Sequence, residues 1–314
     1  MGKHYLKLIF FIVLVILVLS LASPIWGLAA GLAFSLLLGS PFSRESLAKF
    51  HGPLLKIAVV GLGFGLNVNN VLATGQEGAV VTLMMLGVIL LAGLLLSKVF
   101  RVNTRTALLI TSGTAICGGS AIAAMSPIVK AKNIELSTAM GVVFILNAIA
   151  LLIFPMVAKW LDMSGSQFAW WAAMAIHDTS SVVGAASQFG DQSLALATTV
   201  KLSRVLWIIP VSLVAAIAMQ SDKKKFTVPY FIGFFLLAVL LSSYIPFFQT
   251  AAPVFTQVSK VLFTIVLFLI GLGLNKAMFT EMGVRPLLFG TALWIISAIG
   301  SLLLVYTCCS FNSF

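Results

Sequence analysis

Long apolar runs alternate with short polar segments along the whole chain. About 20 helical residues cross the hydrocarbon core of a bilayer, so a long apolar run predicts a transmembrane helix. The runs are continuous, whereas a β-barrel would show alternating segments of about ten residues. We therefore predict an all-α, polytopic membrane protein with eleven spans, at 6–22, 25–40, 53–70, 78–97, 107–130, 136–158, 166–187, 192–218, 227–245, 254–274 and 285–308.

The composition excludes a water-soluble globule. Hydrophobic residues make up 61% of the chain and charged residues 9%, whereas a soluble domain carries about 25% charged residues. The first run has the basic start and apolar middle of a signal peptide, but no clear A-x-A cleavage site follows it. We therefore expect a retained extra span in 1–24, within a single transmembrane domain that covers 1–314.

The basic residues predict the orientation. The net charge of +11 could suggest nucleic acid as a partner, but the 19 Lys and Arg residues lie mostly in short clusters between the apolar runs. With the N-terminus inside, these clusters fall in cytoplasmic loops, as the positive-inside rule requires. We predict a multi-pass protein of the bacterial inner membrane, with its C-terminus outside and no nucleic-acid partner. Lys130 and Lys132 are the exception, because they lie at the predicted outer end of the fifth span.

Motifs of soluble enzyme chemistry do not occur in the sequence. It contains no Walker motif, dinucleotide fingerprint or HExxH. The three cysteines, Cys117, Cys308 and Cys309, have no spacing typical of a disulfide framework, a zinc site or an iron–sulfur cluster. His177 is too close in sequence to Ser180 and Ser181 for a Ser–His hydrolase. We expect a protein that is not an enzyme and that uses no cofactor or metal.

A short internal match predicts a repeat. At a constant offset of 208, Gly63, Gly65, Leu66, Asn67 and Gly75 match Gly271, Gly273, Leu274, Asn275 and Gly283. The matched segments lie in the third and tenth predicted spans, which run in opposite directions. Inverted repeats are typical of secondary transporters. Chance similarity between glycine-rich helices is the alternative.

The fifth predicted span contains a break. Residues 112–127 read SGTAICGGSAIAAMSP, in which a Gly-Gly pair loosens the helix and Pro127 cannot donate a backbone hydrogen bond. A broken helix is tolerated at membrane depth only inside protein or beside a watery cavity. Its candidate substrate-binding residues are Ser112, Thr114, Gly118, Gly119 and Ser120. Close helix packing through small residues is the alternative.

The seventh predicted span carries ionisable residues. His177 and Asp178 fall near its middle, and Thr179, Ser180 and Ser181 follow at once. Ionisable residues inside a bilayer are costly and usually serve a pathway or a proton relay. We expect His177 and Asp178 to couple or gate transport, and the three hydroxyl residues to bind substrate. A structural pair inside the helix bundle is the alternative.

Two bases in the eighth predicted span suggest an anion site. Lys201 and Arg204 are three residues apart and share one helix face. Asp178 lies at a similar depth, so an ion pair between Asp178 and either base is expected. One acid against two bases leaves an excess positive charge, which an anionic substrate would neutralise.

Asn67 and Asn275 end the matched glycine-rich segments. Each is a further candidate for substrate binding, and the plainer interpretation is that each terminates a helix near the membrane interface.

The motifs at 112–124, 176–186 and 200–204, with GLGFGLN at 61–67, resemble the YeiH-like bacterial membrane proteins, a family labelled as sulfate exporters. The resemblance covers nearly the whole chain. It implies a fold of two inverted five-helix repeats, here about 25–160 and 164–308, whose discontinuous helices cross near the membrane midplane. The crossing helices would be the fifth and tenth spans.

These observations predict a secondary transporter for a small anion, either sulfate or an organosulfonate, coupled to protons or sodium. One alternative is a coupled carrier of an organic acid, and another is a channel or a membrane sensor that does not transport. The expected partners are the anionic substrate and the lipid bilayer, and assembly with further copies of the chain is left open.

Overall fold

The computed structural model describes residues 24–219, 230–274 and 282–307, together with residues 5, 7–9, 11, 12 and 14–16. All regular secondary structure in these described residues is helical, which confirms the all-α class. Part of the predicted first span lies outside the described residues, and so does Asn275.

Five helical segments are long and apolar enough to cross a membrane. They have 24 to 32 residues each, and about 20 suffice. Their surfaces carry exposed apolar side chains, for example Leu91, Met156 and Leu303. The chain is therefore a multi-pass helical membrane protein by the length and composition of these segments. They are α4 (Val68–Val99), α7 (Asn133–Trp160), α10 with α11 (Asp191–Val205 and Ile208–Ala218), α13 (Pro246–Gly273) and α15 (Val284–Thr307).

Two compact units interleave along the chain. The first contains Met1–Val71, Val183–Ala185 and Pro229–Lys276, and the second contains Leu72–Val182, Ala186–Val228 and Ala277–Phe314. The division of the chain into repeats at 25–160 and 164–308 stays a prediction.

The first unit packs α2 (Pro24–Leu38), α3 (Arg44–Gly63), α12 (Phe231–Tyr244) and α13 through glycines. A β-carbon added at Gly271 would lie 2.6 Å from the carbonyl oxygen of Leu28 in α2. One added at Gly63 would lie 2.8 Å from the carbonyl oxygen of Phe235 in α12. Small residues allow such close approach of helix backbones. The two glycines that the 208-residue offset matches therefore both mark a close helix crossing.

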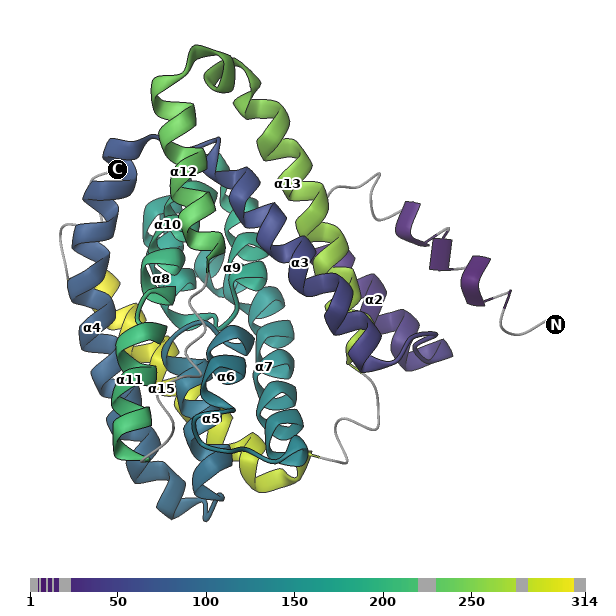
Figure 1. Cartoon of the computed structure of the whole chain (residues 1–314), viewed down its shortest axis with the longest axis vertical. Coiled ribbons are helices and arrows are strands. Elements are labelled where there is room, and N and C mark those ends of the chain that lie inside the picture. The colour runs from purple at the N-terminus through teal and green to yellow at the C-terminus, as the bar shows by residue number, and fades with distance from the viewer. Residues whose placement is uncertain are drawn as a thin grey trace. The chain divides into compact units, whose positions relative to one another are not determined.

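In the second unit, α5 (Thr104–Ala115) and α6 (Gly119–Met125) form a re-entrant hairpin (Figure 1). Arg105, in the first turn of α5, lies 4.0 Å from Glu135, in the first turn of α7. A β-carbon at Gly113 would lie 3.0 Å from the Ile122 side chain, so α6 folds back along α5. The chain thus enters and leaves this hairpin at the same end of the unit, which we call the Arg105 end.

A second re-entrant hairpin consists of α8 (Gly165–Ala175) and α9 (Thr179–Ala186). A β-carbon at Gly165 would lie 3.4 Å from the carbonyl oxygen of Phe189 and 3.6 Å from the β-carbon of Ser193. Phe189 belongs to the short helix η1 (Ser187–Phe189), and Ser193 to the first turn of α10. The start of α8 therefore lies beside the start of α10, at an end that we call the Gly165 end.

The two hairpins enter from opposite ends. Helix α7 joins them, and its 28 residues extend about 42 Å at 1.5 Å per residue. The predictions of spans at 107–130 and 166–187 are therefore wrong, because each segment turns back at its break. The helical break expected in the tenth span is also wrong, since α13 is continuous from Pro246 to Gly273.

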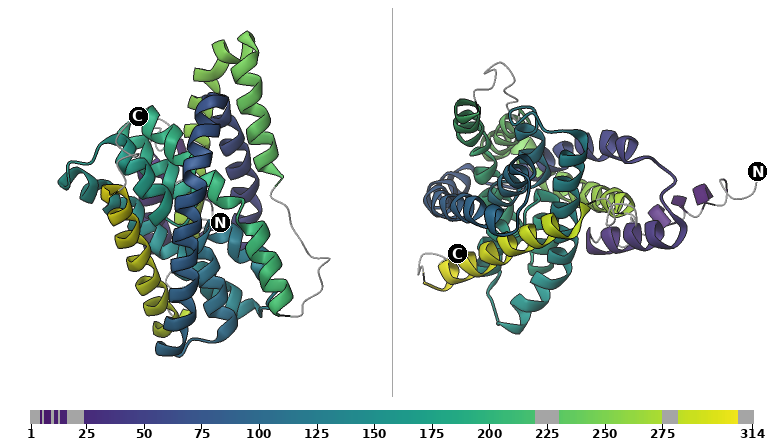
Figure 2. Two further views of the ribbon diagram at one scale, coloured as in Figure 1. Left: turned by 90° about the vertical axis from the view of Figure 1, so that its left-hand side faces the viewer. Right: turned by 90° about the horizontal axis from the view of Figure 1, so that it is seen from below.

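Helix α15 completes the second unit. It lies beside α4, and Figure 2 shows α15 in yellow next to α4 in blue. A β-carbon added at Gly300 in α15 would lie 3.5 Å from the Met85 side chain in α4. Its end lies near the end of α7, because the Tyr306 hydroxyl donates to the carbonyl of Leu161 at 3.4 Å. Helices α7 and α15 therefore run in the same direction, and both pack against α5 and α8 of the hairpins.

Candidate functional site

The two hairpin tips meet inside the second unit. The tips are the non-helical residues 116–118 and 176–178, and both are buried. Gly118 has φ +66°, and a β-carbon there would lie 3.4 Å from the Cα of Asp178. Glycine tolerates this backbone conformation and leaves room for the second tip. The break predicted in 112–127 is therefore confirmed, and it adjoins the segment that carries His177 and Asp178.

Arg204 binds both hairpins. Its side chain is 1% exposed, and its Nε and Nη2 atoms donate to the carbonyls of Ala115 (2.8 Å) and Thr114 (2.9 Å) at the end of α5. Its Nη1 atom donates to the carbonyls of Ala173 (3.3 Å) and Met174 at the end of α8. The last carbonyls of a helix have no partner within the helix and carry a partial negative charge. The guanidinium therefore caps two half-helices at once.

Lys201 reinforces the second hairpin. Its ammonium group is 0% exposed and donates to the carbonyls of Ile176 (2.6 Å) and Ala173 (3.2 Å). Both bases therefore reach Ala173, which confirms that Lys201 and Arg204 share a helix face.

The expected ion pair between Asp178 and these bases is not found within 4.0 Å among the described residues. The prediction failed because the breaks free backbone carbonyls, which lie nearer to the bases than the carboxylate does. The main role of Lys201 and Arg204 in the structure is to bind the carbonyls of the two hairpins. An ammonium has three donors and a guanidinium five, so each base retains one N–H beyond the bonds described.

Asp178 caps the second half of its hairpin. Its carboxylate accepts hydrogen bonds from the Ser180 amide (3.0 Å) and from the Ser180 hydroxyl. This is an N-cap, in which the side chain satisfies an amide that has no partner in the first turn of α9. The carboxylate also opposes the partial positive charge of the helix start.

Asn147 is a site residue that the sequence reasoning missed. Its Oδ1 atom accepts from the backbone amides of His177 (3.1 Å) and Asp178 (3.2 Å), and so fixes the second tip to α7. The signal was available, because Asn147 is an amide side chain in the middle of the apolar run FILNAIALLIF. A polar residue at membrane depth usually faces the protein interior.

Buried polar atoms without a hydrogen-bond partner surround the tips. They are the Thr114 hydroxyl, the Asn147 amide nitrogen and both ring nitrogens of His177. The three side chains are 0%, 2% and 1% exposed. Buried polar groups are usually paired, so this concentration calls for a functional explanation.

The other residues predicted to bind substrate lie in α5, in α6 and in the first turn of α9. Thr179, Ser180 and Ser181 are buried in the first turn of α9. Gly119 is half-buried and Ser120 is exposed on α6, and the Ser112 hydroxyl donates to the carbonyl of Leu109 (2.9 Å) in its own helix.

Asn67 belongs to the first unit and does not take part in the tip contacts. It is exposed, and its Oδ1 atom accepts from the Asn69 amide at 2.9 Å, which caps α4. The alternative of helix termination is therefore the one that the structure supports for Asn67.

Comparison with known proteins gives a consistent result. Residues 7–290 match the sequence model of a family described as conserved hypothetical protein 698. A UPF0324 membrane protein of Porphyromonas gingivalis is 44% identical over 284 residues, which cover 89% of this chain and 86% of that protein. Another from Bacteroides thetaiotaomicron is 42% identical, covering 90% and 86%. One from Photobacterium profundum is 40% identical, covering 94% and 90%. No solved structure matches the chain.

Proposed function

The chain belongs to the UPF0324 family, which is the YeiH-like family of membrane proteins, and we propose that it is a secondary transporter of a small anion. The observation that carries the proposal is the meeting of two re-entrant hairpins, from opposite ends, at buried Lys201 and Arg204. Non-helical backbone at membrane depth is typical of transporter binding sites, where broken helices expose polar groups to substrate.

We propose that the two hairpins are copies of one inverted repeat. At an offset of 60, Ala115, Ile116 and Ser120 match Ala175, Ile176 and Ser180, and the two hairpins enter from opposite ends. Inverted repeats are typical of secondary transporters, so this correspondence favours the proposed function.

The charge balance at the tips favours an anion. Two half-helix C-termini and two N-termini lie there, and their partial charges of roughly half a unit each cancel. Counted by formal charge, Lys201, Arg204 and Asp178 leave one positive charge uncompensated among these three side chains. An uncompensated buried charge is costly, and an anion would offset it.

The donors proposed to hold the anion are the unpartnered groups. The Thr114 hydroxyl, the Asn147 amide and the His177 ring can each supply a hydrogen bond. All three are nearly inaccessible, so we propose that one hairpin tip must open before substrate enters. His177 and Asp178 adjoin this position and are proposed to couple transport to protons or sodium.

The proposed substrate class is sulfate or an organosulfonate, with a small carboxylate as the competing candidate. The sulfur oxyanions come from the resemblance to the YeiH-like family, and the charge balance would serve either class. Comparing the two classes on the same preparation therefore decides between them.

The proposed location is the bacterial inner membrane, with the Arg105 end in the cytoplasm. Lys98, Arg101 and Arg105 lie at this end, and the first hairpin returns Lys130 and Lys132 to it as well. The two lysines that broke the positive-inside pattern of eleven spans now follow it. At the Gly165 end, Lys159 lies near Asp162 in sequence.

The proposal is tested by flux into proteoliposomes that contain the purified full chain. Uptake of radiolabelled sulfate, a sulfonate and a dicarboxylate is measured with imposed pH or sodium gradients. The variant Thr114→Val removes an unpartnered hydroxyl with little change in volume and should reduce uptake at least tenfold. Thr106→Val, a buried threonine in the same helix, is the matched control and should leave uptake unchanged. Uptake that no gradient drives, or that Thr114→Val leaves intact, would contradict the proposal.

A further inference from the structure

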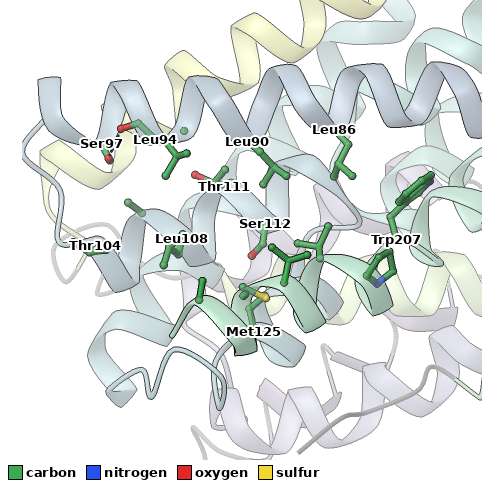
Figure 3. Close-up of a pocket in the computed structure, with 17 residues that line it drawn as sticks. Leu86, Leu90, Leu94, Ser97, Thr104, Leu108, Thr111, Ser112, Met125 and Trp207 are labelled. Carbon is green, nitrogen blue, oxygen red and sulfur yellow. Dashed lines mark hydrogen bonds between the residues drawn. The ribbon is translucent and has the colours of Figure 1, made fainter. Parts of the chain in front are cut away.

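The second unit contains an apolar cavity that the hairpin tips do not use. Its volume is about 420 Å³, and it is lined by α4, α5, α6 and α11 (Figure 3). Most of the lining is aliphatic, for example Leu86, Leu90 and Val214. Ser97 and Thr104 lie together at one end of the cavity, and Leu86 and Trp207 lie toward the other.

The length of this cavity corresponds to one leaflet of a bilayer. Along α4 it extends from Ser97 to Leu86, which is about 16 Å at 1.5 Å per residue. The hydrocarbon core of a bilayer is about 30 Å thick, so one leaflet contributes about half of that. A lipid acyl chain that runs from the surface toward the midplane has this length and polarity.

Basic residues are next in sequence to the residues at the Ser97 and Thr104 end of the cavity. Lys98 follows Ser97 directly, Arg105 follows Thr104, and Arg101 lies in the turn between these two helices. Lys98 and Arg101 are exposed, and the Arg105 side chain is 40% exposed and 4.0 Å from Glu135. Basic clusters at the membrane surface attract anionic lipid headgroups.

We propose that this cavity binds one acyl chain of an anionic phospholipid, whose headgroup lies against Lys98 and Arg101. The aliphatic lining holds the chain through burial of apolar surface. The basic cluster selects an anionic headgroup over a zwitterionic one. The proposed lipid site uses none of the unpartnered polar groups at the hairpin tips, so its test does not require the proposed transport activity.

The test uses Trp207 as a reporter inside the cavity. The full chain is reconstituted in vesicles that contain a small fraction of either phosphatidylglycerol or phosphatidylcholine, each brominated on its acyl chains. Bromine quenches tryptophan fluorescence on contact, and Trp207→Phe identifies the part of the signal that Trp207 contributes. Brominated phosphatidylglycerol should quench this part severalfold more than brominated phosphatidylcholine does at the same fraction.

Three variants sharpen the test. The double variant Lys98→Gln, Arg101→Gln should bring the ratio of quenching by the two lipids close to one. Lys159→Gln removes a positive charge at the Gly165 end, away from the cavity, and as the control it should keep the ratio. Ala215→Phe fills the cavity and should remove Trp207 quenching by both lipids. Equal quenching by both lipids in the native chain, or a preference that survives the double substitution, would overturn the proposal. Lys98 and Arg101 are exposed, so the double variant tests the proposal even if the Ala215→Phe variant fails to fold.

Discussion

The two hairpin tips both join two half-helices, but they differ in backbone conformation and in what stabilises them. The first tip, Ile116–Gly118, depends on Arg204 and on a glycine with positive φ. At the second tip, Ile176–Asp178, Lys201 donates to the carbonyl of Ile176, and Arg204 donates to the carbonyl of Ala173 just before the tip. Asn147 accepts hydrogen bonds from the amides of His177 and Asp178. The half-helices that follow also differ, since α9 is buried throughout, whereas α6 exposes Ser120 and Ala123. This contrast indicates that the second tip is the fixed one and that the first is better suited to open.

The largest effect is expected from Arg204, which serves both tips. Arg204→Met leaves the carbonyls of Thr114 and Ala115 without their donors, and the Met174 carbonyl keeps only the Ser297 hydroxyl. Hydrogen bonds to a charged group contribute about 1.5–3 kcal/mol each and Arg204 makes four, so we expect a loss of about 6 kcal/mol or more. Thermal unfolding in detergent measures the loss, and hydrogen exchange should rise at both tips. Arg204→Lys keeps the charge without the planar fork and should recover only part of the stability. Exchange that rises at one tip alone would contradict the shared role.

Asn147→Ala should loosen the second tip alone. It leaves the amides of His177 and Asp178 without an acceptor, which costs about 2–6 kcal/mol at 1–3 kcal/mol for each group. Hydrogen exchange of residues 176–181 should increase while that of residues 113–119 stays unchanged. Asn103→Ala is a matched control outside the site, because it removes an exposed cap from α5. If both tips exchange faster in Asn147→Ala, the tips are not stabilised separately.

Gly118→Ala should perturb the first tip. A side chain at φ +66° is strained by about 1–3 kcal/mol, and the new β-carbon would lie 3.3 Å from Val143. Gly119→Ala is the neighbouring control, because its β-carbon would make ordinary contacts of 3.4–3.6 Å and its φ is not positive. We expect a lower unfolding temperature and reduced anion flux for Gly118→Ala, and near-native values for Gly119→Ala. Equal stability of the two variants would show that the backbone conformation at Gly118 is not required.

Asp178→Asn should have the smallest effect on stability. Asparagine is as good an N-cap as aspartate, so Ser180 keeps its acceptor and the change should stay below about 1 kcal/mol. The removed negative charge should instead alter the dependence of flux on pH or sodium, as measured in proteoliposomes. A variant that transports with native ion dependence would remove Asp178 from the coupling role.

The sequence predicted the class of fold and much of the site, but not the path of the chain. The Gly-Gly pair at 118–119 predicted the first break, and His177 and Asp178 were singled out as ionisable residues without a break being predicted at them. Segments 107–130 and 166–187 were read as spans because a hairpin of two apolar half-helices has the same hydropathy as one helix. The misplaced Lys130 and Lys132 were the visible sign of the error. The capping role of Lys201 and Arg204 could not be foreseen, since it depends on carbonyls from α5 and α8 meeting in space.

Cysteine accessibility in whole cells tests the opposed hairpins most directly. Cys117, Cys308 and Cys309 are first replaced by alanine, and single cysteines are then placed at exposed positions by Thr104→Cys, Asn133→Cys, Lys159→Cys and Gln192→Cys. A membrane-impermeant maleimide labels only the sites that face outward. The hairpins predict that 104 and 133 are protected together and that 159 and 192 are labelled together. If 133 is labelled and 159 is protected, both segments cross the membrane as single spans and the account is contradicted.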